Sequence, residues 1–135
     1  MAPRTSSARS SALRLSTPGG PRAPERVRAW LQSADWLPEE LEATLMLLTC
    51  ELVNNSVLHG RASEQDVIEV ELRPTRTGLR AEVTDPGRGF TPSGRQRDLD
   101  EPGGWGLVLV ERIAAEWGVE HDDRTRVWFE LSAAA

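Results

Sequence analysis

The sequence has no lysine, and all sixteen of its basic residues are arginine. A Walker-type phosphate-binding loop places a lysine on the nucleotide phosphates, so any nucleotide site in this chain must be built in another way. There is a single cysteine, Cys50, and therefore no disulfide within the chain. Because Cys50 stands in an apolar helical stretch, a buried structural thiol is its ordinary interpretation.

Long apolar runs are also absent. No stretch approaches the roughly 20 apolar residues that a bilayer-spanning helix needs, and residues 1–24 lack the continuous apolar segment of a secretory signal. The net charge of −5 disfavours nucleic acid as a partner, because the arginines are dispersed among carboxylates. We therefore expect a cytoplasmic protein that binds neither membrane nor nucleic acid directly.

Length and composition are those of one compact domain, with 135 residues of which 39% are hydrophobic and 27% charged. Residues 1–11 contain too little apolar material to offset the entropy of ordering, so we expect a disordered arm there and a single domain over residues 12–132.

Hydrophobic periodicity and turn residues predict the secondary structure. The expected elements are strand 12–16, helix 24–34, helix 38–59, strands 67–72 and 79–83, a long loop over 85–104, helix 105–117, a strand near 119–121 and a strand over 126–131. This order predicts an α+β fold, a two-layer α/β sandwich in which helices cover one face of a mixed, mostly antiparallel sheet.

The helix expected over residues 38–59 is the clearest element. Pro38 followed by Glu39 and Glu40 is typical of a helix start, because proline fits the first turn and carboxylates suit the positive end of the helix dipole. Apolar residues cover this helix nearly all round, which predicts a position in the domain core.

Three polar residues of this helix, Glu51, Asn55 and His59, recur every four positions and so project from one side. They permit two interpretations. In the first, they make local hydrogen bonds along a half-exposed edge. In the second, they form an oxygen-ligand site in which Glu51 orients water or accepts a proton and Asn55 is a hard ligand for Mg²⁺.

Two glycine-containing segments follow later in the chain. DPGRG at 85–89 has the chemistry of an ordinary turn, but its second glycine would also let the backbone approach a flat ligand while Asp85 accepts a hydrogen bond from an exocyclic amine. PGGWGL at 102–107 fits either a flexible hinge or a helix start whose backbone N–H groups bind phosphate oxygens.

The combination is more specific than its parts. An asparagine on a core helix, Asp-x-Gly-x-Gly after a strand and Gly-x-Gly at a helix start resemble the three sequence boxes of the GHKL superfamily of ATPases, which includes gyrase, heat-shock chaperones and histidine kinases. ELVNNSVLH at 51–59 looks most like the first box of the small anti-sigma factor serine/threonine kinases, Glu-x-x-x-Asn-Ala/Ser-x-x-His. The similarity extends from about residue 13 to residue 131 and implies the Bergerat ATP-binding fold.

The resemblance implies a role for each matched position. Glu51 would be the general base of phosphoryl transfer, Asn55 would coordinate Mg²⁺ between the ATP phosphates, and Asp85 would read the adenine amino group. The other implied nucleotide-binding positions are Gly87 and Gly89 at the base, and Gly104, Gly106 and Leu107 at the phosphates. Residues 90–103 would form a lid over the nucleotide.

The same resemblance implies ATP and Mg²⁺ as cofactors, and two protein partners. The kinase would phosphorylate an anti-anti-sigma protein of the STAS type and would hold a sigma factor inactive, and a homodimer is common among the relatives. The alternative is a non-catalytic module whose ATP site gates a protein-binding surface, and the intact Glu51 favours the kinase. A detached histidine-kinase catalytic domain is disfavoured because the sequence shows no dimerisation helix with a phosphoaccepting histidine.

Some positions depart from the family pattern or stay unassigned. The lid segment mixes arginines with carboxylates, so the group that meets the γ-phosphate is not identified. DRTR at 123–126 lacks the Gly-Lys-Thr order that often precedes the last strand, which puts a role for Thr125 in doubt. His59 has no assigned role. Most of the tryptophans are expected in the core, with Trp105, inside the glycine segment, as the exception.

Overall fold

The computed structural model describes residues 12–58, 62–86, 105–121 and 123–133. Its elements, in chain order, are β1 (Leu13–Pro18), α2 (Ala23–Ser33), α3 (Glu39–Leu58), β2 (Val67–Pro74), β3 (Gly78–Asp85), α4 (Trp105–Ile113), β4 (Glu116–His121) and β5 (Thr125–Ser132). The expected arm over residues 1–11, His59 and most of the expected loop over 85–104 lie outside the described residues.

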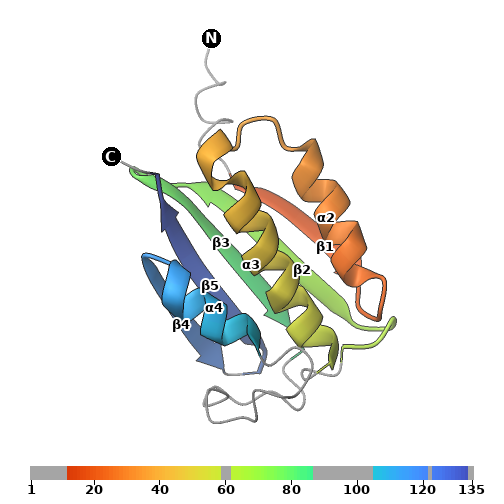
Figure 1. Cartoon of the computed structure of the whole chain (residues 1–135). Coiled ribbons are helices and arrows are strands. Elements are labelled where there is room, and N and C mark those ends of the chain that lie inside the picture. The colour runs from red at the N-terminus through yellow and green to blue at the C-terminus, as the bar shows by residue number, and fades with distance from the viewer. Residues whose placement is uncertain (1–11, 59–61, 87–104, 122, 134–135) are drawn as a thin grey trace.

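The strands form one sheet in the order β1-β2-β3-β5-β4. The three helices α2, α3 and α4 lie against one face of it, with α3 between the other two (Figure 1). The expected two-layer α+β sandwich is therefore confirmed. Every strand pair described is antiparallel, where a mixed, mostly antiparallel sheet was expected.

The core fills the space between the helices and the sheet. In β3, Leu79, Ala81 and Val83 are buried toward the helices, whereas Arg80 and Glu82 alternate onto the other face. Burying a side chain the size of leucine contributes about 1.5–3 kcal/mol. The largest fully buried side chains of the described residues include Phe129, Leu31, Leu45, Leu48, Leu52, Ile68, Leu72 and Leu79.

Helix α3 begins where the sequence predicts. The Leu41 N–H donates to the Pro38 carbonyl oxygen at 2.9 Å, and three glutamates occupy the first turn. The expectation that its apolar surface is buried nearly all round holds only for the inner side, since Leu47 on the outer side is 44% exposed. In the described part of the chain, no helix combines the length and the apolar character that a bilayer crossing needs.

The helix expected over residues 105–117 is shorter in the structure. Helix α4 ends at Ile113, and Trp117 belongs to β4, so the predicted end was wrong. The alanines before Trp117 suit a helix, but the Ala115 N–H donates to the Glu130 carbonyl oxygen at 2.8 Å, and the pairing with β5 continues from there. Tertiary pairing therefore overrides local propensity at this point.

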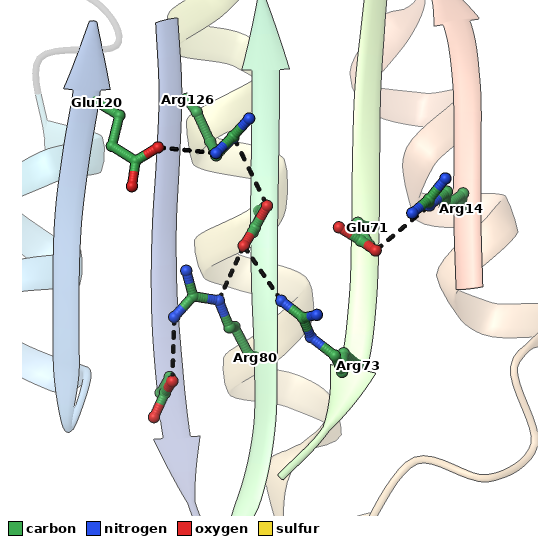
Figure 2. Close-up of polar contacts among 8 residues, drawn as sticks. Arg14, Glu71, Arg73, Arg80, Glu120 and Arg126 are labelled. Carbon is green, nitrogen blue, oxygen red and sulfur yellow. Dashed lines mark hydrogen bonds and ion pairs between the residues drawn. The ribbon is translucent and has the colours of Figure 1, made fainter. Parts of the chain in front are cut away.

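The face of the sheet away from the helices carries a network of arginine and glutamate side chains (Figure 2). At its centre Glu82 pairs with Arg80 at 2.9 Å, with Arg73 at 3.5 Å and with Arg126 at 3.7 Å. Further pairs join Arg80 to Glu130 at 3.1 Å, Arg126 to Glu120 at 2.7 Å and Arg14 to Glu71 at 3.3 Å.

Trp128 lies on this same open face. The Arg80 guanidinium carbon is 4.1 Å from the centroid of the Trp128 ring, within cation–π range. A Cβ atom at Gly118, on the neighbouring strand, would approach the Trp128 ring to 2.7 Å, so glycine leaves room for the indole. The expectation that most tryptophans are in the core is wrong for Trp128, while Trp30, Trp36 and Trp117 pack partly buried against the core.

Candidate functional site

Asn55 is buried near the C-terminal end of α3, with 2% of its surface exposed. Among the described residues, neither its Oδ1 nor its Nδ2 atom has a hydrogen-bond partner. A buried polar group left without a partner costs about 1–3 kcal/mol, so an interior amide of this kind calls for a functional explanation. Glu51 lies one helical turn earlier and is partly exposed, where a carboxylate stays hydrated. His59, the third residue of the expected trio, is outside the described residues.

Asp85 is the last residue of β3 and faces the helix layer, with 3% of its surface exposed. Its direct partner on β5 is Thr125, which is 1% exposed. The structure therefore brings Thr125 to the predicted site, although its sequence context left a role in doubt. The alternation of buried residues along β5, in which Thr125 shares a face with Val127 and Phe129, is the signal that could have found it.

A third side chain extends this row onto the next strand. His121 of β4 is the cross-strand partner of Thr125, and its Nδ1 atom lies 2.5 Å from the Thr125 hydroxyl oxygen, in hydrogen-bond contact. Asp85, Thr125 and His121 thus occupy one line across β3, β5 and β4. Nothing in the sequence pattern alone pointed to His121, because the contact depends on the strand order.

The start of α4 lies at the same end of the molecule. Figure 1 shows the C-terminal ends of α3 and β3 and the first turn of α4 gathered at one end of the sandwich. Of the predicted phosphate-binding positions, Gly106 falls in the first turn of α4, and Leu107 is 3% exposed and belongs to the core. Gly87, Gly89 and Gly104 lie outside the described residues, as does the expected lid.

Two other groups on α3 belong to the structure of the core. Burial raises the pKa of the Cys50 thiol, against the opposing effect of Arg28, and its Sγ atom lies 3.9 Å from the Pro24 carbonyl oxygen. A half-buried thiol held in its neutral form fits the structural interpretation of Cys50. The Thr49 hydroxyl is also buried without a hydrogen-bond partner among the described residues.

A separate hollow of about 360 Å³ lies on the open face of the sheet. It is lined by side chains of the ionic network and its neighbours, among them Arg14, Glu71, Glu82 and Arg126. None of the predicted site residues lines this hollow. Two ion pairs lie in its lining, Arg14 with Glu71 and Arg126 with Glu82.

The comparisons with known proteins agree with this arrangement. A family model of the histidine kinase-like ATPase domain matches residues 21–131. A crystal structure of the RsbU and RsbW domains of Rv1364c from Mycobacterium tuberculosis is similar, with a TM-score of 0.66 and 24% sequence identity, over 93% of this chain and 33% of that one. The chain thus spans about a third of the length of that protein, and the likeness shows a shared fold. Comparison with curated protein sequences gave no significant match.

Proposed function

We propose, since the chain belongs to the histidine kinase-like ATPase family, that it binds ATP with Mg²⁺ and transfers the γ-phosphoryl group to a serine or threonine of a partner protein. The observation that carries this proposal furthest is Asn55, a buried amide whose Oδ1 and Nδ2 atoms have no partner among the described residues. Both atoms of this amide are therefore available to a ligand, and a ligand that used them would offset the cost of burying them.

The buried pair Asp85 and Thr125 is suited to the adenine base. A carboxylate accepts hydrogen bonds and does not donate them, so Asp85 selects a base that presents an exocyclic amine. A hydroxyl both donates and accepts, and Thr125 can therefore meet the adjacent edge of the same base. Both groups are buried, so water competes little for their hydrogen bonds to the base.

The buried amide of Asn55 is suited to the phosphate end. Its Oδ1 atom is a hard oxygen ligand of the type that Mg²⁺ accepts, and the bound ion would neutralise charge on the phosphates. The described residues contain no cluster of three or more histidine, cysteine, aspartate or glutamate side chains. An ion held through Asn55 would also take ligands from phosphate oxygens and water, and ATP binding would then depend on Mg²⁺. Gly104, Gly106 and Leu107 stay the proposed phosphate-binding positions, with Gly87 and Gly89 at the base.

Glu51 is the proposed general base. It lies four residues before Asn55 on α3 and so projects from the same side of the helix. Its partial exposure leaves it accessible to the hydroxyl of a protein substrate. In the proposed reaction the Glu51 carboxylate takes the proton of that hydroxyl, the oxygen bonds to the γ-phosphorus, and the bond from phosphorus to the ADP oxygen breaks.

The proposed substrate is an anti-anti-sigma protein of the STAS type, and a sigma factor is the proposed second partner. The fold shared with a protein that contains RsbU and RsbW domains supports this choice of partner class. A homodimer and a cytoplasmic location, where ATP is available, belong to the same proposal. The competing hypothesis is a non-catalytic module whose ATP site gates its binding surface.

An assay of phosphoryl transfer distinguishes the kinase from the non-catalytic module. The chain would be incubated with γ-labelled ATP, Mg²⁺ and the purified anti-anti-sigma protein encoded nearest to it, and label on that protein would be measured. We expect transfer by the wild type, a loss of about 100-fold or more in Glu51→Gln, and no change in Glu39→Gln, an exposed glutamate at the far end of the same helix. Undiminished transfer by Glu51→Gln refutes the base assignment, and ATP binding without any transfer favours the non-catalytic module.

A further inference from the structure

We infer that His121 is a positioning residue of the nucleotide site, which holds the Thr125 hydroxyl in the orientation that meets the base. The inference rests on the proposed ATP site and deepens it, because it names a residue on a strand that carries none of the predicted site residues. It starts from one contact, the 2.5 Å separation between His121 Nδ1 and Thr125 Oγ1.

The two residues differ in burial, and this difference assigns their roles. Thr125 is 1% exposed and lies opposite Asp85, whereas His121 is exposed at the edge strand β4. A ligand beside Asp85 would therefore meet Thr125, with His121 behind it on the next strand. His121 acts through Thr125 and not on the base itself.

The hydrogen bond to His121 fixes the orientation of the Thr125 hydroxyl. Threonine has one donor proton and two acceptor lone pairs, and its χ1 angle selects which way the oxygen points. His121 Nδ1 engages one of these three capacities and so holds the Thr125 rotamer, which leaves the other capacities for a ligand beside Asp85. A hydroxyl that is already oriented before binding loses less entropy when the base arrives, so affinity is gained from pre-organisation.

The test uses substitutions at an exposed position, which should leave the fold intact. His121→Phe keeps a planar ring without a nitrogen, and His121→Asn places an amide atom close to the position of Nδ1. Calorimetric titration with Mg-ATP is expected to show affinity about three- to tenfold weaker for His121→Phe and close to the wild-type value for His121→Asn. Glu116→Gln, an exposed change on the same strand, is the matched control and should bind like the wild type.

A double-mutant cycle separates positioning from a general effect on the strand. In a Thr125→Val background, the additional change His121→Phe should weaken binding no further, because the hydroxyl that His121 positions is gone. Equal losses in both backgrounds, or wild-type affinity in His121→Phe, would overturn the inference.

A nucleotide-free readout keeps this inference apart from the proposed function. The ¹⁵N chemical shift of His121 Nδ1 is expected to change in Thr125→Val, because the hydrogen bond is lost, and an unchanged shift overturns the inference. The wild type could show the hydrogen bond by this shift and still not bind Mg-ATP. In that case the contact between His121 and Thr125 is real, but the proposed ATP site is refuted.

Discussion

Asp85 and Thr125 stand directly opposite each other on β3 and β5, and both are almost completely buried, at 3% and 1% exposure. Both lie at the end of the sandwich where α3 ends and α4 begins (Figure 1). The proposed site therefore draws its parts from both layers of the fold. In the proposal, the sheet would contribute the groups that read the base, and the helices would contribute the groups that bind phosphate and metal.

We expect the Asn55 side chain to lower the stability of the ligand-free protein and to contribute to nucleotide binding. Asn55→Leu replaces an amide that has no hydrogen-bond partner among the described residues by an apolar group with the same branching, so the free energy of unfolding without nucleotide should rise by about 1–2 kcal/mol. The same variant should lose Mg-ATP binding. Chemical denaturation and calorimetry measure the two effects.

The control for this substitution is the neighbouring Asn54, which is only partly buried and is not the matched asparagine. Asn54→Leu should leave Mg-ATP affinity unchanged. An Asn55→Leu protein that is less stable than the wild type would show that the amide has a structural partner, and would remove the main support for its role as a ligand.

Glu82 is expected to contribute to stability and not to nucleotide binding. It is the shared partner of three arginines, and only 12% of its side chain is exposed, so its interactions are screened less than those of a surface ion pair. Burial opposes the charged form of Arg80, but hydrogen bonds to Glu82 and Glu130 outweigh it and raise the pKa of Arg80. Glu82→Gln should lower the free energy of unfolding by about 1–3 kcal/mol.

Denaturation curves at low and high salt would measure this change. Mg-ATP affinity should be unaffected, because Glu82 lies on the face of the sheet away from the helices. Arg14→Gln, which removes a pair in which the arginine side chain is 78% exposed, is the matched comparison and should cost much less. Equal costs for the two variants would contradict the central place of Glu82 in the network.

Much of this architecture follows from periodicity. The alternating segments that became β2 and β3, and the capped apolar segment that became α3, were predicted within a few residues of their ends. The misplaced end of α4 and the position of Trp128 on the open face of the sheet share one cause, since both depend on how β4 and β5 pair. Pairing between strands is a property of the whole fold, which a local pattern does not contain.

Some residues of the proposed site could be predicted from sequence motifs, and others could not. Asn55 and Asp85 stand in motifs, and the structure places both in the interior near one end of the sandwich. Thr125 stands in an atypical turn and His121 in no motif, so only the cross-strand register brings them to the site. The roles assigned to Asn55, Asp85, Glu51 and the glycines all stay predictions.

Cys50 is expected to react slowly with thiol reagents in the folded protein. Burial raises its pKa, so a smaller fraction is present as the reactive thiolate at neutral pH than in the unfolded chain. Because the pKa of Cys50 is higher in the folded protein than in the unfolded chain, the protonated thiol favours the folded state. This stabilisation is complete below the pKa of the unfolded thiol and is lost as the pH rises through the pKa of the folded protein.

Alkylation by iodoacetamide, followed by mass spectrometry, measures the reactivity of Cys50 with and without denaturant. We expect the rate at neutral pH to be at least several-fold faster in denaturant, as desolvation is the main cause of the shift. Cys50→Ala should bind Mg-ATP like the wild type. Rapid alkylation of the folded protein would instead indicate an accessible, activated thiol.

The most direct measurement is a calorimetric titration of the folded protein with ATP, with and without Mg²⁺, beside the Asp85→Asn variant. Binding that requires Mg²⁺ and becomes about 10- to 100-fold weaker in Asp85→Asn, a loss typical of a hydrogen bond to a charged group, is the predicted result. Glu71→Gln, on the open face of the sheet, should bind like the wild type and serves as the control. Absence of binding by a wild-type protein that unfolds cooperatively, or equal affinity in Asp85→Asn, would contradict an ATP site at the buried end of β3.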